Sequence, residues 1–468
     1  MSRKTKIIAT LGPASASAEV IGAMVGAGLD VARLNFSHGD HESHRRMISC
    51  VREAAGEHRR AVAVLQDIQG PRIRVGTFPG GAVELTQGSR VRLVSGEGEG
   101  DAGRVFVQHL DTIRLRPGDR VLCADGMVVL TVRDLDAKTV VVDVVTGGTL
   151  ADHKGVALPG VEVGLPAVTP KDEADLAFGR DVGVDLVAAS FVTSGADIRL
   201  VRSVAGDVPV IAKIERAEAY ANLGDILDEA DGAMVARGDL GVELGFEPLP
   251  RVQKEIIART HDAGGISITA TEMLESMTAS PRPTRAEVTD VANAVLDGSD
   301  AVMLSAETAV GKYPVRTIEV MARICTEAER SPGYPARVTA GFLADDVPFP
   351  TAIAQAVADT ANILRLGTVV AFTESGNTAR LVSRYRPNSR IVAFTPSADT
   401  FHRLAIVWGV TPLLFPRYAS TDEMIAQAER VLLEQGLVAS GEWVAMVAGI
   451  PPNQQASTNL LKLHVVGG

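Results

Sequence analysis

The sequence has few cysteines and no long apolar segment, and each shortage excludes a class of protein. Cys50, Cys123 and Cys325 are far apart and show no metal-binding spacing, so we expect three buried thiols in a reducing cytoplasm. No run approaches the ~18 apolar residues that cross a bilayer. The basic N-terminus reaches Pro13 too early to contain the core of a signal peptide.

Basic residues are also in deficit. The chain carries 46 Lys and Arg against 57 Asp and Glu, for a net charge of −11 and a pI near 5.4. This balance argues against a general nucleic-acid or anionic-membrane binder. It does not exclude an anionic small-molecule substrate, because a cleft can be locally basic.

Short apolar runs alternate with stretches of helical periodicity, and the length of 468 residues suggests about three domains. Alternating strands and helices predict a parallel sheet, and eight such units with polar residues at their carboxyl ends predict a closed (β/α)₈ TIM barrel. The eight expected strands are 5–11, 31–36, 61–68, 186–192, 208–214, 233–236, 266–270 and 301–304.

The alternation stops after the third strand. Residues 70–167 have period-two apolar patterning with many turn residues, which predicts an inserted all-β domain, a small barrel placed as a lid over the barrel mouth. After the Pro- and Gly-rich stretch 331–335 the α/β pattern restarts. We therefore expect a catalytic barrel of residues 1–69 and 168–335, and a separate open α/β domain at 336–468.

Charged residues gather where two expected strands end. Lys213 and Glu215 stand two apart, so their side chains project to the same side of a strand. The next strand ends before Gly238 and Asp239, whose amides open a helix and can receive a carboxylate or phosphate. Two carboxylates and a lysine suit a divalent ion beside a phosphate; a solvated loop is the alternative.

Other strand ends supply further polar groups. Arg33, Asn35 and Ser37 share one face, and Asp67 ends the third strand. A guanidinium suits bidentate phosphate binding, and the oxygen-bearing side chains suit a hard cation. Thr271 offers a hydroxyl at the barrel mouth. The alternatives are a hydrogen-bonded network at the rim and, for Thr271, a helix N-cap.

Several long blocks, in order, resemble the signatures of one family. The chain is similar to pyruvate kinases along its whole length, through TKIIATLGPAS, ARLNFSHG, HKGVALPG, IAKIE, MVARGDLGVE, ATEMLESM, SPRPTRAE and DGSDAVMLSAETAVGKYP. The resemblance implies transfer of a phosphoryl group from phosphoenolpyruvate to ADP, giving pyruvate and ATP at the end of glycolysis. It also implies a homotetramer.

The resemblance assigns a role to each site residue. Arg33 and Lys213 would contact the phosphoryl group, with Arg74 as a further phosphate-side arginine, and Thr271 would belong to the proton relay. Glu215 and Asp239 would bind Mg²⁺ or Mn²⁺. A monovalent-cation site would be formed by Asn35, Ser37, Asp67 and the Ile68 carbonyl. The nucleotide would be contacted by His38 and Lys154.

The segment QDIQGPRIRVG departs from the commonest family pattern. Potassium-dependent members resemble DTKGPEIRTG, with a glutamate where this chain has Arg72. Members without that glutamate carry a basic residue in its place, together with a glutamine at the position of Gln69 and an aliphatic residue at the position of Val75. A fixed guanidinium can replace the charge of bound K⁺, so K⁺ is predicted not to be required. The alternative is an Arg72 that points to solvent.

A loop in the third domain resembles the family's effector-phosphate loop. It comprises Thr373, Glu374, Ser375, Gly376, Asn377 and Thr378. Hydroxyls and amides at a helix start suit a phosphate. Because Glu374 would repel a second phosphate, we expect little activation by fructose 1,6-bisphosphate; AMP or a sugar monophosphate is the alternative effector, and simple helix capping the alternative role.

Two other functions compete with this interpretation. One is a TIM-barrel enzyme that handles pyruvate or phosphoenolpyruvate by carbon–carbon chemistry, which would not depend on ADP. The other is a catalytically silent metabolite sensor, against which the intact Arg33, Lys213 and Thr271 argue. Glu272 stands where a glutamine is usual, and the sequence offers no physical reason for it.

Overall fold

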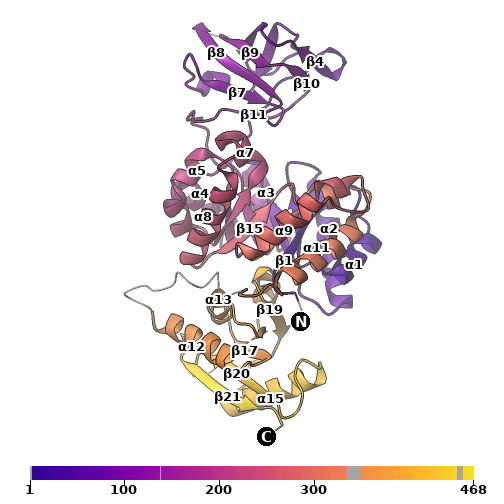
Figure 1. Cartoon of the computed structure of the whole chain (residues 1–468), viewed down its shortest axis with the longest axis vertical. Helices are drawn as coiled ribbons and strands as arrows, with labels where there is room; N and C mark the ends of the chain where they lie inside the picture. Colours follow the sequence, from indigo (N-terminus) through magenta and orange to yellow (C-terminus); the bar gives the residue numbers. More distant parts are fainter. Residues whose placement is uncertain (1–2, 137–138, 335–347, 451–456, 468) are drawn as a thin grey trace.

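The molecule is elongated, with an all-β lid at one end, a barrel in the middle and an α/β domain at the other end (Figure 1). This computed structural model describes residues 3–136, 139–334, 348–450 and 457–467. The predicted domain boundary at 335/336 lies outside the described residues; 69/70 and 167/168 remain proposed boundaries.

The central body is a closed ring of eight parallel strands, in the order β1-β16-β15-β14-β13-β12-β3-β2. These strands are buried almost throughout, as expected when helices cover the outside and side chains fill the inside. The predicted (β/α)₈ barrel is thereby confirmed. Its strands are β1 (Lys6–Leu11), β2 (Val31–Asn35), β3 (Ala63–Asp67), β12 (Leu186–Ala189), β13 (Val210–Ile214), β14 (Gly232–Ala236), β15 (Ile266–Ala270) and β16 (Ala301–Leu304).

Helices surround this ring, and one of them differs from the sequence-based expectation. The sequence has helical periodicity throughout 217–228, but the helix breaks at Asn222, whose side-chain amide donates to the Thr193 carbonyl at 2.9 Å. The helices are α1 (Ala18–Ala27), α2 (His41–Glu57), α3 (Pro170–Asp181), α4 (Gly195–Ala205), α5 (Ala217–Ala221), α6 (Leu223–Glu229), α7 (Arg237–Leu244), α8 (Leu249–Asp262), α9 (Arg285–Leu296), α10 (Ala306–Ala309) and α11 (Pro314–Ala328).

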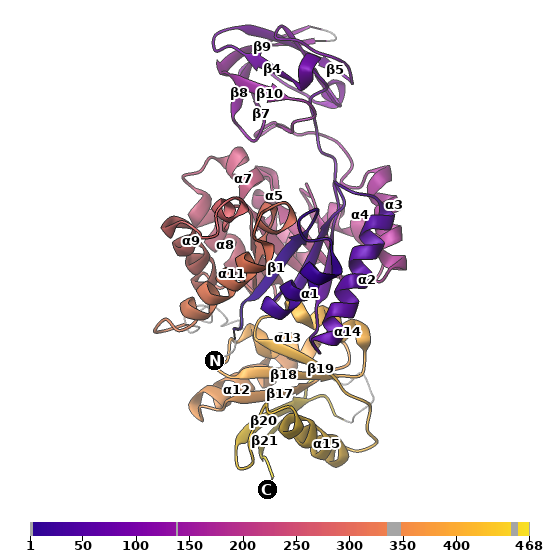
Figure 2. The same ribbon diagram turned by 90° about the vertical axis from the view of Figure 1, so that its right-hand side faces the viewer.

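The inserted all-β lid is joined to the barrel by extended segments (Figure 2). Its strands are β4 (Ala82–Leu85), β5 (Arg90–Ser95), β6 (Arg104–Val107), β7 (Arg120–Cys123), β8 (Val128–Asp136), β9 (Thr139–Thr146), β10 (Gly148–Ala151) and β11 (Val156–Ala157). Among the described residues they form a six-stranded sheet and a two-stranded sheet around one apolar core. The small barrel is therefore an open one.

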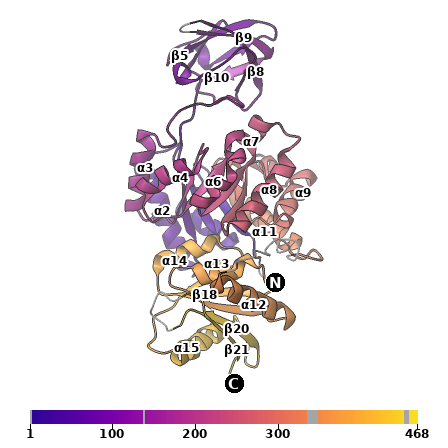
Figure 3. The ribbon, with the colours of Figure 1, turned by 90° about the vertical axis from the view of Figure 1, so that its left-hand side faces the viewer.

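The C-terminal domain is an open sheet in the order β19-β18-β17-β20-β21, with only β21 antiparallel. Two apolar clusters cover its faces, one beneath α12 and α13 and the other beneath α15 (Figure 3). Its elements are α12 (Phe349–Ile363), β17 (Thr368–Phe372), α13 (Asn377–Arg384), β18 (Arg390–Thr395), α14 (Ala398–Arg403), β19 (Val410–Leu414), α15 (Thr421–Glu434), β20 (Trp443–Ala448) and β21 (Leu460–Val465).

Buried polar contacts join this domain to the amino-terminal end of the barrel. Arg386 forms an ion pair with Asp300 at 2.8 Å, and Lys6 donates to the Val410 carbonyl at 2.7 Å.

Two of the three cysteines are buried thiols, as expected from the sequence. Burial raises the pKa of Cys123 and of Cys325 to about 12. Cys50 is only half-buried. Over the described residues, every helix is too short or too polar to cross a bilayer.

Candidate active site

The carboxyl ends of the barrel strands enclose a cavity of about 120 Å³, here called the barrel-mouth cavity. Successive strands deliver their last side chains to it because parallel strands of a barrel all end at the same face. Nine residues proposed from the sequence line it, namely Arg33, Asn35, Ser37, Asp67, Arg72, Lys213, Glu215, Asp239 and Thr271. The exposed Glu272 is not among its lining residues.

Asp67 is the anionic centre of this cavity. Its carboxylate accepts from Arg33 Nε at 2.6 Å and lies 3.3 Å from Lys213 Nζ. Burial raises its pKa, but the two neighbouring cations outweigh burial and hold the pKa below its ordinary value. Asp67 is thus ionised, and both cations are fixed in place before any ligand arrives.

Glu215 and Asp239 provide the carboxylates that a metal ion would need. Glu215 lies 2.7 Å from Lys213 Nζ and accepts from the Phe191 amide at 2.7 Å. Burial, and then the negative charge of Asp239, raise the pKa of Glu215. Within the described part of the chain, Asp239 has no hydrogen bond or ion pair of its own. A divalent cation fits here, because it would relieve the repulsion between the two carboxylates.

Glu215 and Asp239 offer a small set of side-chain ligands. In the ranges that the structure describes, no group of three or more His, Cys, Asp or Glu side chains is placed to hold a metal ion. Such a sparse donor set suits Mg²⁺, which keeps several waters and substrate oxygens in its shell and needs only one or two carboxylates.

Thr271 follows β15 with a backbone φ of 67°, an unfavourable angle for a β-branched residue. Its carbonyl accepts from Arg237 Nη2 at 2.6 Å, and the same guanidinium pairs with Asp290 at 2.7 Å. Its hydroxyl accepts from the Gly238 amide at 2.9 Å. The strained backbone turns the hydroxyl into the cavity, and the helix start at α7 holds it there.

Arg72 borders two cavities at once. It lines the barrel-mouth cavity and also a cavity of about 170 Å³ between lid and barrel, here called the lid cavity. Its side chain forms no hydrogen bond or ion pair within the described residues, and its guanidinium lies against Gly155 of the lid. An unpaired, half-buried cation is thus available to any anion in either cavity.

The other proposed residues lie around these cavities. Arg74 donates to the His153 carbonyl at 2.8 Å, and burial and the nearby Arg72 lower its pKa. The exposed His38 and Lys154 contact no cavity among those described here. The Ile68 carbonyl already accepts the hydroxyl of Ser190 at 2.7 Å.

Ser190 was missed by the sequence analysis. It follows β12, receives Lys213 Nζ at 2.9 Å and lies 3.2 Å from Asp67. A polar residue directly after an apolar strand was the available signal, as it was for Ser305, which also lines the cavity. Gln69, named above as part of the hinge pattern, lines it too.

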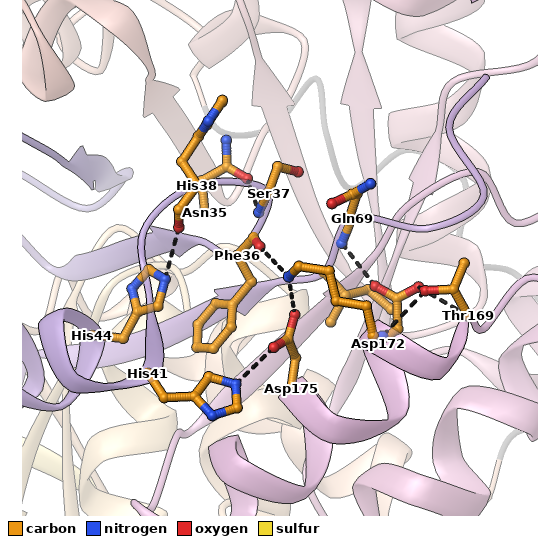
Figure 4. Close-up of polar contacts among 12 residues, drawn as sticks. Asn35, Phe36, Ser37, His38, His41, His44, Gln69, Thr169, Asp172 and Asp175 are labelled. Atoms are coloured by element: carbon orange, nitrogen blue, oxygen red, sulfur yellow. Dashed lines mark hydrogen bonds and ion pairs between the residues drawn. The ribbon is translucent and has the colours of Figure 1, made fainter. Parts of the chain in front are cut away.

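One buried carboxylate ties both ends of the lid to the barrel (Figure 4). Asp172, near the start of α3, accepts from the amides of Gln69 and Gly70 at 3.0 and 3.1 Å, where the chain leaves for the lid. It also accepts from the amide of Thr169 at 3.0 Å and its hydroxyl at 2.6 Å, where the chain has returned. We call this arrangement the hinge clasp.

The adjacent turn of α3 holds the loop after β2. Lys171 donates to the Phe36 carbonyl at 2.6 Å and to Asp175 at 2.5 Å, and His41 also reaches Asp175 at 2.8 Å (Figure 4). Asn35 Oδ1 accepts from the Ser37 amide at 3.1 Å in the same loop. The hinge and the Asn35–His38 loop are therefore fixed by one helix.

The C-terminal domain holds a separate cavity of about 330 Å³, here called the loop cavity. Thr373, Glu374, Ser375, Asn377 and Thr378 line it, together with aromatic side chains from β17, β18 and the segment that follows β19. Glu374 forms a two-point ion pair with Arg417, at 3.1 and 2.9 Å. The cationic side chain at this cavity is thus already matched by a carboxylate.

Comparisons with known proteins agree with this geometry. Residues 2–318 match the family described as "Pyruvate kinase, barrel domain", and residues 351–464 match "Pyruvate kinase, alpha/beta domain". The chain is 44% identical to a pyruvate kinase of Geobacillus stearothermophilus over all of its length and 81% of the relative's. It is 42% identical to one of Staphylococcus aureus over 99% of its length and 81% of the relative's.

A solved structure extends the agreement to three dimensions. A pyruvate kinase from Cryptosporidium parvum superposes with a TM-score of 0.93 at 37% identity, covering 99% of this chain and 96% of that one. The chain belongs to the pyruvate kinase family, a class of phosphotransferases.

Proposed function

We propose that this chain transfers the phosphoryl group of phosphoenolpyruvate to ADP, forming pyruvate and ATP in a Mg²⁺-dependent and K⁺-independent reaction. The observation that carries the proposal is the barrel-mouth cavity, where two buried cations, Arg33 and Lys213, and three carboxylates converge at the strand ends. A Mg²⁺ ion held by Glu215 and Asp239 would supply positive charge beside the transferring group.

The remaining work falls to the side chains of the chain itself. Arg33 and Lys213 stabilise the charge that spreads over the phosphoryl oxygens during transfer, because they are fixed, charged and largely removed from water. The Thr271 hydroxyl belongs to the relay that protonates the enolate to pyruvate. Arg74 lies farther out, beside the lid connector, as a further phosphate-side cation.

The nucleotide belongs in the lid cavity, which continues from the barrel mouth. Its walls come from both bodies, with Gly126 of the lid facing Val242 of α7. His38 and Lys154 would approach the nucleotide from the rim of the lid cavity. Movement of the lid toward the barrel would then exclude water from the phosphoryl group.

Arg72 is the proposed substitute for a bound potassium ion. It lines the barrel-mouth cavity without an anionic partner in the described residues, so its charge is free to act where K⁺ acts in other members. Asn35, Ser37, Asp67 and the Ile68 carbonyl then serve as architecture. The hydrogen bonds of Asn35 and Ile68 to protein groups support this assignment.

The loop cavity is the proposed effector site, and a monophosphate is its proposed ligand. Its hydroxyl groups and backbone amides suit one phosphate, whereas Glu374 disfavours a second. We also propose the homotetramer typical of the family.

The deciding experiment is an assay of pyruvate formation from phosphoenolpyruvate, with ADP, Mg²⁺ and K⁺ omitted one at a time. We expect no product without ADP or Mg²⁺, and rates within about twofold when K⁺ is replaced by a bulky organic cation. Product formed without ADP would contradict the phosphoryl transfer. A large activation by K⁺ would keep the reaction and contradict the role of Arg72.

A further inference from the structure

A fourth cavity lies between the barrel and the C-terminal domain, on the opposite side of the barrel from the mouth. It has a volume of about 210 Å³ and is here called the interdomain cavity. Its C-terminal wall comes from α13, α14 and the loop before α13, with Ser375 and Gly376. Ser375 also lines the loop cavity, so the loop separates the two cavities.

Two arginines face this cavity without partners. Arg380 of α13 and Arg403 of α14 line it, and neither forms a hydrogen bond or ion pair through its side chain with the described residues. The Nε atom of Arg403 is buried and unsatisfied. Burial lowers the pKa of Arg380 and the positive charge of Arg403 lowers it further, and together they outweigh the opposing attraction of the Asp231 carboxylate. Partly buried polar groups are normally satisfied, so this pair calls for an anionic partner.

The carboxylates in the cavity do not fill that role. Asp231 is engaged by Arg202 at 2.5 Å and by the Val210 amide at 2.8 Å. Asp207 is exposed and has no hydrogen bond or ion pair in the described part of the chain. The cavity therefore retains an excess of positive charge at its arginine end.

The barrel wall of the cavity is made by the strands that carry the active site. Leu186 opens β12 and Ile266 opens β15, while Pro209 and Asp231 immediately precede β13 and β14. The opposite ends of these four strands deliver Ser190, Lys213, Glu215, Asp239 and Thr271. Because a strand of five residues spans only about 17 Å, the interdomain cavity and the barrel-mouth cavity lie at the two ends of the same short strands.

We propose that the interdomain cavity binds a small phosphate-bearing anion through Arg380 and Arg403, as a site separate from the barrel mouth and the loop cavity. Two guanidiniums from different helices suit a phosphate group, which offers several acceptor oxygens to such forks. The volume admits a phosphate with a small organic group, since a single water needs only about 10–15 Å³ by the same measure. Asp207 would then lie near the organic part.

The test is calorimetric titration of the full chain with inorganic phosphate and, separately, with glycerol 3-phosphate. We expect Arg380→Gln and Arg403→Gln each to weaken binding about tenfold, the loss of one charge-assisted hydrogen bond. Two matched variants assign the site: Arg417→Gln alters the loop cavity and Lys213→Met alters the barrel mouth. Both should retain this binding event.

A variant that strengthens binding guards against loss through misfolding. Asp207→Asn removes a negative charge from the rim, so we expect tighter binding by about twofold to fivefold. Tighter binding of the ester than of phosphate would identify a metabolite ligand, and the reverse order would identify inorganic phosphate; both support the site. Binding that survives Arg380→Gln and Arg403→Gln, or that disappears in Arg417→Gln or Lys213→Met, would overturn the proposal.

Discussion

The barrel-mouth cavity and the loop cavity both offer cations and hydroxyls to an anion, but they hold their charges in opposite ways. In the barrel, Lys213 and Asp67 are 12% and 2% exposed and are fixed by each other. In the loop cavity, Arg417 and Glu374 are 61% and 33% exposed. Buried charges need partners at all times, whereas an exposed pair can separate at little cost. The first arrangement suits chemistry that requires fixed positions, and the second suits a ligand that comes and goes.

Replacing Lys213 would break the comparison most severely. Lys213→Met removes a fixed charge from the phosphoryl group and leaves Asp67 and Glu215 with one cation fewer. We expect kcat to fall by about 10²–10³-fold, as for the loss of one preorganised charge-stabilising group. Steady-state kinetics would measure the loss. Lys254→Met is a matched control, because Lys254 is an exposed lysine paired with Asp297, and it should leave kcat unchanged. A Lys213→Met enzyme within a fewfold of the parent would refute the assigned role.

Removing the Asp67 carboxylate tests whether the buried ion pair contributes more to the stability of the fold than the exposed pair does. Asp67→Asn leaves Arg33 charged and buried without its anion, so we expect a loss of about 3 kcal/mol in the free energy of unfolding. Thermal denaturation followed by circular dichroism would detect this as a fall in Tm of several degrees. The matched change at the exposed pair, Glu374→Gln, should cost less than about 1 kcal/mol. Equal losses in the two variants would contradict the contrast between the sites.

Arg72 sharpens the comparison, because it is a cation of the barrel mouth that has no anionic partner among the described residues. Arg72→Glu should create a demand for a monovalent cation, so that K⁺ stimulates the variant by about tenfold and the parent hardly at all. The measurement is the rate with K⁺ divided by the rate with a bulky organic cation. Arg72→Gln controls for loss of the positive charge alone. If neither variant responds to K⁺, Arg72 does not act in place of the ion.

The smallest effect is expected at the loop cavity. Glu374→Lys frees Arg417 and adds a second cation, so affinity for fructose 1,6-bisphosphate should rise about fivefold to tenfold. Calorimetric titration would show this rise, and the Tm should change by no more than about a degree. Ser420→Ala, at the cap of the neighbouring α15, offers a control outside the cavity lining. Unchanged affinity would mean that Glu374 does not limit binding of the second phosphate.

Much of the fold could be predicted because the barrel strands are buried on both sides and therefore stand out as short apolar runs. β15 and β16 have the bounds that the sequence suggested. The break at Asn222 could not be foreseen, since it depends on a hydrogen bond to the distant Thr193 carbonyl. Local periodicity carries no information about such a contact.

The site residues could be predicted only where local sequence pattern places them. Side chains on regular strands, such as Arg33 and Lys213, follow from the period of two, and Glu215, directly after β13, continues it. Ser190 was missed because it lies just beyond β12, before Phe191 turns to a positive φ of 56°. Asp172 was not among the site residues proposed from the sequence, although it forms a capping box with Thr169. Its bonds to Gln69 and Gly70, about a hundred residues away, are tertiary contacts that no local pattern reveals.

The hinge clasp makes the lid a cassette. Because a single carboxylate touches the backbone both where the chain departs and where it returns, the two splice points are neighbours in space. We therefore expect that a lid of another length or sequence, or a short linker, can be placed between Gly70 and Thr169 without moving the end of β3 or the start of α3. The lid cavity, whose walls come from both parts, would change with the lid that is attached.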